Sequence, residues 1–227
     1  MASAISKHEI RRNPLAEWVG STIRFVQKRR AIILAALVVL LVVGAAGAAY
    51  VWYQARQERE ASIALSEAQA GLRSEKPGEA PKAEDSIRRL QDIARQFRGT
   101  ESAEEALIRL GNLQYDNGKV DEAKAAFDEY LKSYPRGRFV LMAGLGKAYA
   151  DEARGDFQGA AQTLADTLSA KSDAAFAGEL YTALARVYEN LKKTDEAVRV
   201  YDQIVERYPQ TSWAQNALSR ISALKTK

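Results

Sequence analysis

Few residues in this 227-residue chain could carry out catalysis. It contains no cysteine and a single histidine, His8. Without a cysteine there is no thiolate nucleophile, no disulfide and no cysteine ligand for a metal ion. Because the lone histidine lies in a polar N-terminal stretch, no Ser-His-Asp or Cys-His arrangement is available to a folded domain. We therefore predict no catalytic residue, no metal site and no cofactor, and we expect a protein that is not an enzyme.

Adjacent acidic residues are the remaining candidates for acid–base chemistry. They are Glu104-Glu105, Asp121-Glu122 and Asp151-Glu152. All three pairs lie in stretches predicted to be helical, where a carboxylate faces solvent or favourably meets the helix dipole in the first turn. A phosphate-binding loop is not indicated either, because Gly144 and Gly146 lie inside a helical pattern and are interpreted as packing glycines. No small-molecule substrate is expected.

Binding chemistry is better represented. At equivalent positions of a repeated helical pattern the chain has Asn112, Lys147 and Arg186, with Tyr115 close to the first. One amide and two cations in a row could hold a peptide carboxylate or an acidic segment. The alternative is that all four are ordinary solvated helix residues. We take them as the candidate peptide groove.

A long apolar segment, Ala31 to Tyr53, precedes the repeated pattern and could attach the candidate groove to a membrane. Its 23 residues carry no charge, and roughly 20 apolar residues suffice for a helix to cross a bilayer. We predict a transmembrane helix that contacts the lipid bilayer. The alternative is a signal peptide cleaved near Ala46-Gly47-Ala48, but the apolar run continues past that point and the stretch before it is long for a signal.

Charge sets the expected orientation of this helix. Residues 1–30 hold seven Lys and Arg against two Glu, whereas residues 54–227 are close to neutral. The positive-inside rule then places the N-terminal tail in the cytoplasm and residues 54–227 in the periplasm of a bacterial inner membrane. Within the tail, Asn13-Pro14 starts an apolar periodicity that predicts either an amphipathic helix on the inner leaflet or a simple extension of the transmembrane helix. The nearly neutral domain argues against nucleic-acid binding.

The rest of the sequence repeats a helical hairpin. The matching positions are Leu107-x2-Leu110-Gly111, Gly118, Ala123-x3-Phe127 and Pro135; Leu145-Gly146-x2-Tyr149, Gly155 and Ala160-x3-Leu164; and Tyr181-x2-Leu184-Ala185-x2-Tyr188, Ala197-x3-Tyr201 and Pro209. They fit the tetratricopeptide pattern, in which small residues let paired helices approach and aromatic residues fill the space between hairpins. This alignment makes the turn inside the second hairpin two residues longer than in the first.

The sequence thus predicts an all-α protein with one transmembrane helix followed by a tetratricopeptide solenoid. We expect repeats at about 104–137, 139–172 and 178–211, and a capping helix at 211–225, within a domain of residues 54–227. The segment 75–81, which contains two prolines and a glycine, is predicted to interrupt the helix that leaves the membrane.

The order of these segments resembles that of a known family. A basic tail, one span ending in Val51-Trp52-Tyr53, a charged helix and then repeats is similar to the YfgM-like ancillary subunits of the SecYEG translocon. The resemblance implies a non-catalytic adaptor that associates with SecYEG and with a membrane-anchored periplasmic chaperone or prolyl isomerase. Junctions such as Tyr134-Pro135 and Tyr208-Pro209 also resemble envelope scaffolds of cell division and outer-membrane assembly, which is the alternative. Lipoproteins among these need an acylated cysteine, which this chain lacks.

Overall fold

A computed structural model describes residues 14–73, 83–171 and 176–226, without the side chains of 14–27, 72–73 and 171. The first 13 residues of the predicted tail (1–30) and the predicted break at 75–81 lie outside these residues. All regular secondary structure that the model describes is helical, which confirms the predicted all-α class. The chain forms two compact units, Met1–Ala55 and Arg56–Lys227.

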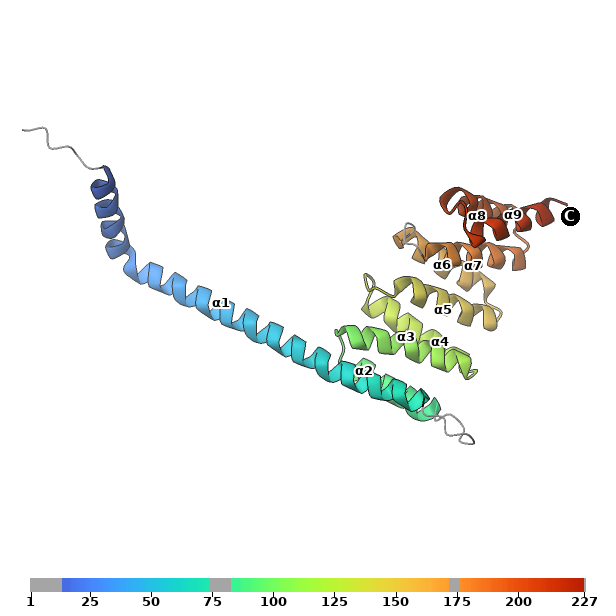
Figure 1. The fold of residues 1–227 in the computed structure, drawn as a ribbon, viewed down its shortest axis with the longest axis horizontal. Helices are drawn as coiled ribbons and strands as arrows, with labels where there is room; N and C mark the ends of the chain where they lie inside the picture. The colour runs from blue at the N-terminus through green and yellow to red at the C-terminus, as the bar shows by residue number, and fades with distance from the viewer. Residues whose placement is uncertain (1–13, 74–82, 172–175, 227) are drawn as a thin grey trace, which may run out of the picture. The chain divides into compact units, whose positions relative to one another are not determined.

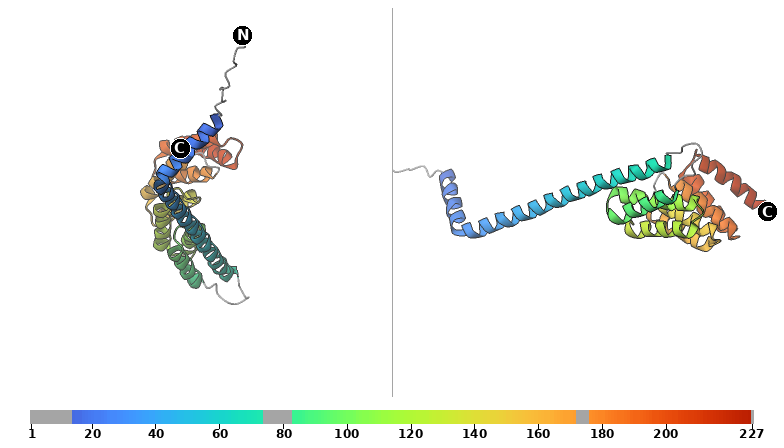
Figure 2. Two further views of the ribbon diagram at one scale, coloured as in Figure 1. Left: turned by 90° about the vertical axis from the view of Figure 1, so that its left-hand side faces the viewer. Right: turned by 90° about the horizontal axis from the view of Figure 1, so that it is seen from below.

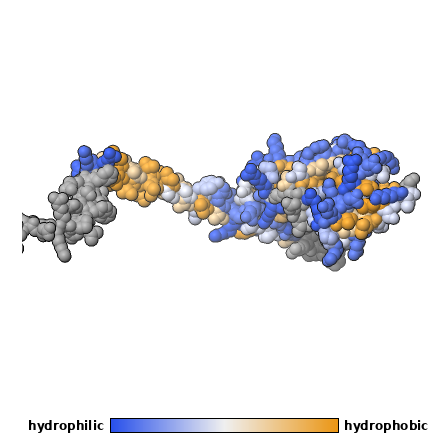
Figure 3. Space-filling view, turned by 90° about the horizontal axis from the view of Figure 1, so that it is seen from above, coloured by the Kyte–Doolittle hydropathy of each residue, from blue (hydrophilic) through white to orange (hydrophobic). Residues whose placement is uncertain are grey.

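The first unit contains most of a long helix, α1 (Pro14–Arg73). Arg29 has non-helical backbone angles (φ −117°, ψ 17°), so the helix is kinked there, as Figure 1 shows. Beyond the kink, the section Lys28–Gly71 is the one candidate membrane span among the described residues, judged by length and composition. Its apolar side chains are exposed, Leu40 at 70%, and form the hydrophobic band of Figure 3. Such a helix is compatible with membrane association.

The second unit is a stack of helical hairpins (Figures 1 and 2). After the end of α1 come α2 (Ala83–Gln96), α3 (Glu101–Asp116), α4 (Val120–Ser133), α5 (Val140–Ala153), α6 (Phe157–Lys171), α7 (Ala177–Asn190), α8 (Thr194–Arg207) and α9 (Ser212–Lys225). Each helix contacts the next from α2 onward, and α3, α5, α7 and α9 also contact one another in succession. We call these four helices the first-helix layer and α2, α4, α6 and α8 the second-helix layer.

The hairpins follow a regular period of 37 residues. Left-handed backbone angles occur at Gly118 (φ 76°), Gly155 (φ 79°) and Lys192 (φ 60°), each in the three-residue turn between the two helices of a hairpin. The three turns therefore have equal length, and the longer turn expected in the second hairpin is wrong. The extra residues lie between hairpins instead. As a result Ala148, and not Gly146, occupies the position of Gly111.

Apolar side chains between the layers form the core. One cluster runs from Ala61 and Leu65 of α1 to Ala143 of α5, and a second runs from Leu141 of α5 to Ile221 of α9. Phe127 of α4 is 1% exposed and its ring lies against both Gly111 of α3 and Gly146 of α5. Because a Cβ at either glycine would overlap the ring, the missing side chains let one aromatic residue join two hairpins.

Candidate peptide-binding groove

Three of the four predicted groove residues lie on the same side of the first-helix layer. Tyr115 and Arg186 line one pocket together, and Asn112 lines a neighbouring pocket. Lys147 lines a third pocket, which it shares with residues of α4 and α6. The structure therefore brings Tyr115 and Arg186 together, keeps Asn112 close to them along α3, and separates Lys147 from all three.

The pocket of Tyr115 and Arg186 is aromatic and spans successive hairpins. It has a volume of about 540 Å³, and Tyr115 of α3, Tyr149 of α5 and Phe157 of α6 supply its rings. The Arg186 guanidinium of α7 lies 5.4 Å from the centroid of the Tyr149 ring and 2.7 Å from a carboxylate oxygen of Glu152. Tyr115 keeps 37% of its surface exposed. Such a site offers ring faces, a hydroxyl and a guanidinium to a ligand.

The Tyr149 hydroxyl is held at the back of this pocket. It lies 3.5 Å from Glu179 of α7, whose other carboxylate oxygen accepts from the Trp213 indole at 3.3 Å. Burial raises the pKa of Tyr149, and the negative charge of Glu179 raises it further. The phenol therefore stays protonated and keeps its hydrogen to donate at neutral pH.

The pocket of Asn112 is smaller, and both apolar and charged residues line it. Its volume is about 330 Å³, and Ile108, Phe139 and Met142 line it. Met142 is 43% exposed, and a methionine side chain adapts readily to different apolar partners. Arg138 lies over Phe139, 4.6 Å from the ring centroid. The two pockets are separate sites on one exposed surface of α3, α5 and α7.

The repeat domain matches a known protein family. A family model described as "YfiO: Outer membrane lipoprotein" matches residues 58–227. The chain belongs to the YfiO family. No curated protein matches the chain at a significant level.

Solved tetratricopeptide structures share the fold of this YfiO-family chain at low sequence identity. A tetratricopeptide repeat protein from Parabacteroides merdae has a TM-score of 0.59 and 14% identity, over 74% of this chain and 61% of that one. A MamA protein has a TM-score of 0.55 and 15% identity, over 73% of this chain and 82% of that one. MamA from Desulfovibrio magneticus RS-1 has a TM-score of 0.52 and 18% identity, over 73% of this chain and 95% of that one. The predicted tetratricopeptide solenoid is thereby confirmed, a fold typical of non-catalytic proteins that bind other proteins.

The position of Lys147 corrects the sequence alignment of the second repeat. In the 37-residue register Lys147 is equivalent to Leu110, Leu184 and Ile221, which are all buried core residues. Its ammonium lies 2.7 Å from a carboxylate oxygen of Asp128 in α4. A shift of two residues turns a helical position by about 200°, to the opposite side of the helix. The equivalent of Asn112 and Arg186 is Tyr149.

Sequence reasoning therefore missed Tyr149 as a groove residue, together with Met142 and Phe157. The signal that could have revealed Tyr149 was the period of 37 residues that Ala123, Ala160 and Ala197 already carry. Applied to Asn112, that spacing gives Tyr149 and then Arg186. The pocket positions of Met142 and Phe157 depend on how neighbouring helices pack, which no spacing records.

Five of the six adjacent acidic residues have structural partners among the described residues, Glu122 being the exception. Glu104 accepts from the Tyr130 hydroxyl at 3.0 Å, Glu105 pairs with Arg109 at 2.6 Å, Asp121 pairs with Arg154, Asp151 pairs with Lys124 at 2.6 Å and Glu152 pairs with Arg186. Most of these contacts join different helices, so these carboxylates tie helices of the YfiO-family domain together. Buried Asp151, at 1% exposure, is the one whose loss should matter most.

Proposed function

We propose that this YfiO-family protein is a membrane-anchored adaptor whose first-helix layer binds a segment of a partner protein. The observation that supports it best is the aromatic pocket in which Tyr115, Tyr149 and Arg186 come from three successive hairpins. An extended peptide that crosses the layer would meet ring faces for apolar side chains and the Arg186 guanidinium for a carboxylate. The Asn112 pocket, with exposed Met142, would take a further apolar side chain of the same peptide.

In this proposal the apolar section of α1, Ala31 to Tyr53, spans the bacterial inner membrane. Arg29 and Arg30 would lie at the cytoplasmic surface, where positive charge is retained, and Trp52 and Tyr53 at the opposite interface. The repeats would then lie in the periplasm. Tethering raises the effective concentration of the groove for partners in the same membrane, so modest affinity would suffice.

The partner that we propose is the SecYEG translocon together with a membrane-anchored periplasmic chaperone or prolyl isomerase. This follows from the resemblance to YfgM-like subunits in the order of tail, span and repeats. A second candidate is a scaffold for outer-membrane assembly or cell division, which the outer-membrane description of the matched family favours. The chain has no cysteine to carry a lipid, so the second role would also rest on α1 as the anchor.

Site-specific crosslinking in a bacterial host tests both the groove and the partner. A photoreactive residue at Tyr115 should crosslink SecYEG subunits or their chaperone, and Arg186→Glu should abolish the product by reversing the charge in the pocket. Arg199→Glu, an exposed position on α8, is the matched control and should retain it. Crosslinks only to outer-membrane assembly or division proteins would favour the second candidate, and crosslinks insensitive to Arg186→Glu would reject the groove.

Protease treatment of spheroplasts tests the topology separately. A tag at the C-terminus should be lost from intact spheroplasts while the untreated protein stays in the membrane at full length. A protected tag would place the repeats in the cytoplasm and contradict the proposal. A shorter, soluble protein released with the periplasm would show cleavage near Ala46-Gly47-Ala48.

A further inference from the structure

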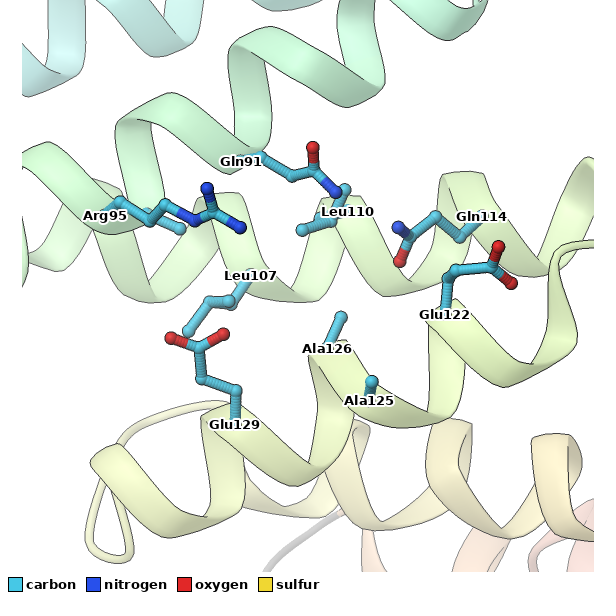
Figure 4. Close-up of a pocket in the computed structure, with 10 residues that line it drawn as sticks. Gln91, Arg95, Leu107, Leu110, Gln114, Glu122, Ala125, Ala126 and Glu129 are labelled. Carbon is cyan, nitrogen blue, oxygen red and sulfur yellow. The ribbon is translucent and has the colours of Figure 1, made fainter.

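A further pocket lies in the second unit, on the opposite side of α3 from the groove. It lies between α2 and α4 over the middle of α3, with a volume of about 200 Å³ (Figure 4). From α3 it is lined by Leu107, Leu110 and Gln114, whereas Ile108 and Asn112 of the same helix line the groove pocket. At 100° per residue these two sets point in nearly opposite directions. A ligand in one pocket would not obstruct the other.

The floor of this pocket is apolar. Leu107 and Leu110 of α3 are 2% and 5% exposed, and Ala94 of α2 and Ala126 of α4 complete the floor at 3% and 5%. The two alanines keep the space open between the second-layer helices. A volume of about 200 Å³ suits one large apolar side chain, which would be removed from water on all sides but the mouth.

The walls of the pocket carry opposite charges. On the α2 side Arg95 is exposed and makes no ion pair within the described part of the chain. On the α4 side lie Glu122, which is also without an ion pair among those residues, and Glu129, which pairs with Arg98 at 3.0 Å. In Figure 4 the Arg95 guanidinium points into the space between the walls. The cation on one wall and the unpaired carboxylate on the other make the two sides of this pocket electrostatically different, so a charged ligand would bind it in one direction.

Gln114 adds a polar group that the fold does not satisfy. It is 3% exposed, its amide points into the pocket in Figure 4, and its Oε1 has no hydrogen-bond partner among the described residues. A buried acceptor without a donor is unfavourable. Gln91 of α2 places a second amide at the mouth. Side-chain amides of this kind match the alternating N–H and C=O groups of an extended peptide backbone.

We propose that this pocket is a second docking site, for an extended segment of a partner protein with an acidic, a large apolar and a basic residue in succession. The acidic residue meets Arg95, the apolar side chain fills the space over Leu107 and Leu110, and the basic residue meets Glu122. Gln91 and Gln114 bind the backbone between them. Because the groove lies on the other side of α3, the protein would hold two partners at once. The second site thus extends the proposed adaptor function, but it does not depend on binding at the groove.

Selection from a random peptide library displayed on phage tests this proposal with the full-length protein in lipid nanodiscs. Enriched peptides should share the acidic–apolar–basic triplet. Synthetic peptides with that triplet should lose at least about tenfold in affinity for Arg95→Glu. A peptide in which the acidic residue is replaced by lysine should regain affinity for the same variant, because the charge pair is restored with reversed sign.

Two further variants separate this site from the groove. Ala125→Trp, an exposed position at the mouth, should block the pocket and weaken the same peptides, whereas Arg186→Glu in the groove should leave their affinity unchanged. Circular dichroism should show that all three variants stay folded, because the changed residues are exposed. The proposal is overturned if no triplet is enriched, or if the enriched peptides respond to Arg186→Glu and not to Arg95→Glu and Ala125→Trp.

Discussion

Glu58 of α1 caps the N-terminus of α3 through Ser102, 44 residues further along the chain. Its carboxylate accepts from the Ser102 hydroxyl at 2.5 Å and from the backbone N–H groups of Glu101 at 2.7 Å and Ser102 at 3.2 Å. The local cap, Thr100, accepts from the N–H of Ala103 at 3.1 Å. A carboxylate is favoured there because the first N–H groups of a helix lack partners and carry partial positive charge. The end of α1 is thereby fixed to the hairpin of α3 and α4.

Removal of that carboxylate should destabilise the repeat domain. We expect Glu58→Ala to lower the free energy of unfolding by about 1–3 kcal/mol, because the N–H groups of Glu101 and Ser102 lose a charged acceptor. Urea denaturation followed by circular dichroism, in the micelle that holds the full chain, measures it. The control is Glu60→Ala, which breaks only a solvent-exposed pair with Arg56 and should lower the free energy of unfolding far less. Equal losses in the two variants would argue against the cap.

Phe127 should make Gly111 intolerant of any side chain. A Cβ at Gly111 would lie 2.6 Å from Cε1 of Phe127, which is 1% exposed and has little room to move. We expect Gly111→Ala to cost about 1–3 kcal/mol through overpacking, despite its better helix propensity. The helical Gly71 is the matched control, since its Cβ would meet only Ser86 Oγ at 3.7 Å. Gly71→Ala should stabilise by up to about 1 kcal/mol. If Gly111→Ala and Gly71→Ala changed the free energy of unfolding in the same direction, this packing would be contradicted.

Lys192 occupies a backbone conformation that suits glycine. Its φ of 60° matches those of Gly118 and Gly155 at the equivalent turns, and a residue with a Cβ is strained there. We expect Lys192→Gly to raise the midpoint of thermal unfolding, with a gain of about 1 kcal/mol. Gly155→Lys makes the reverse change at the matched turn and should lower it. If Lys192→Gly is destabilising, the turn does not hold the left-handed conformation.

The ion pair of Lys124 and Asp151 should show strong coupling. Asp151 is 1% exposed, one of its oxygens lies 2.6 Å from the Lys124 ammonium, and the other has no partner among the described residues. Lys124→Met should cost about 3–5 kcal/mol by leaving a buried carboxylate unpaired. The double variant Lys124→Met/Asp151→Leu should recover most of that loss. A double-mutant cycle on urea unfolding measures the coupling, and additive effects would show that the pair does not interact.

Alkaline pH should destabilise the third hairpin through Tyr201. Burial raises the pKa of Tyr201 to about 12, and its hydrogen bond to Glu189 adds to the shift. An unfolded tyrosine titrates near 10. The folded state therefore binds the Tyr201 proton more tightly than the unfolded state does. The contribution of this proton to the free energy of unfolding is complete below pH 10 and is lost as the pH rises from 10 through 12. Unfolding free energies should fall less steeply over this range for Tyr201→Phe. An unchanged slope would refute the shift.

The amino-acid sequence alone determined the helical class and the apolar section of α1, and it placed Asn112, Tyr115 and Arg186 on one exposed side of their helices. Each depends on local pattern: Ala31 to Tyr53 is uninterruptedly apolar, and Asn112, Tyr115 and Arg186 lie on the polar side of helices whose other side must be buried. Hydrophobic burial fixes which side of an amphipathic helix faces the core, so such positions can be read from spacing.

Only the tertiary structure decided the register of the second hairpin and the contacts between distant residues. The second hairpin has Gly144 and Lys147 where the first has Leu107 and Leu110, so the apolar pattern that sets the register of the first repeat is missing from it. Gly146 lies two residues before Ala148, which is the true equivalent of the small residue Gly111. The cap of α3 by Glu58 arises because residues far apart in sequence are brought together by packing. No periodicity records such a pair, because its energy depends on three-dimensional proximity alone.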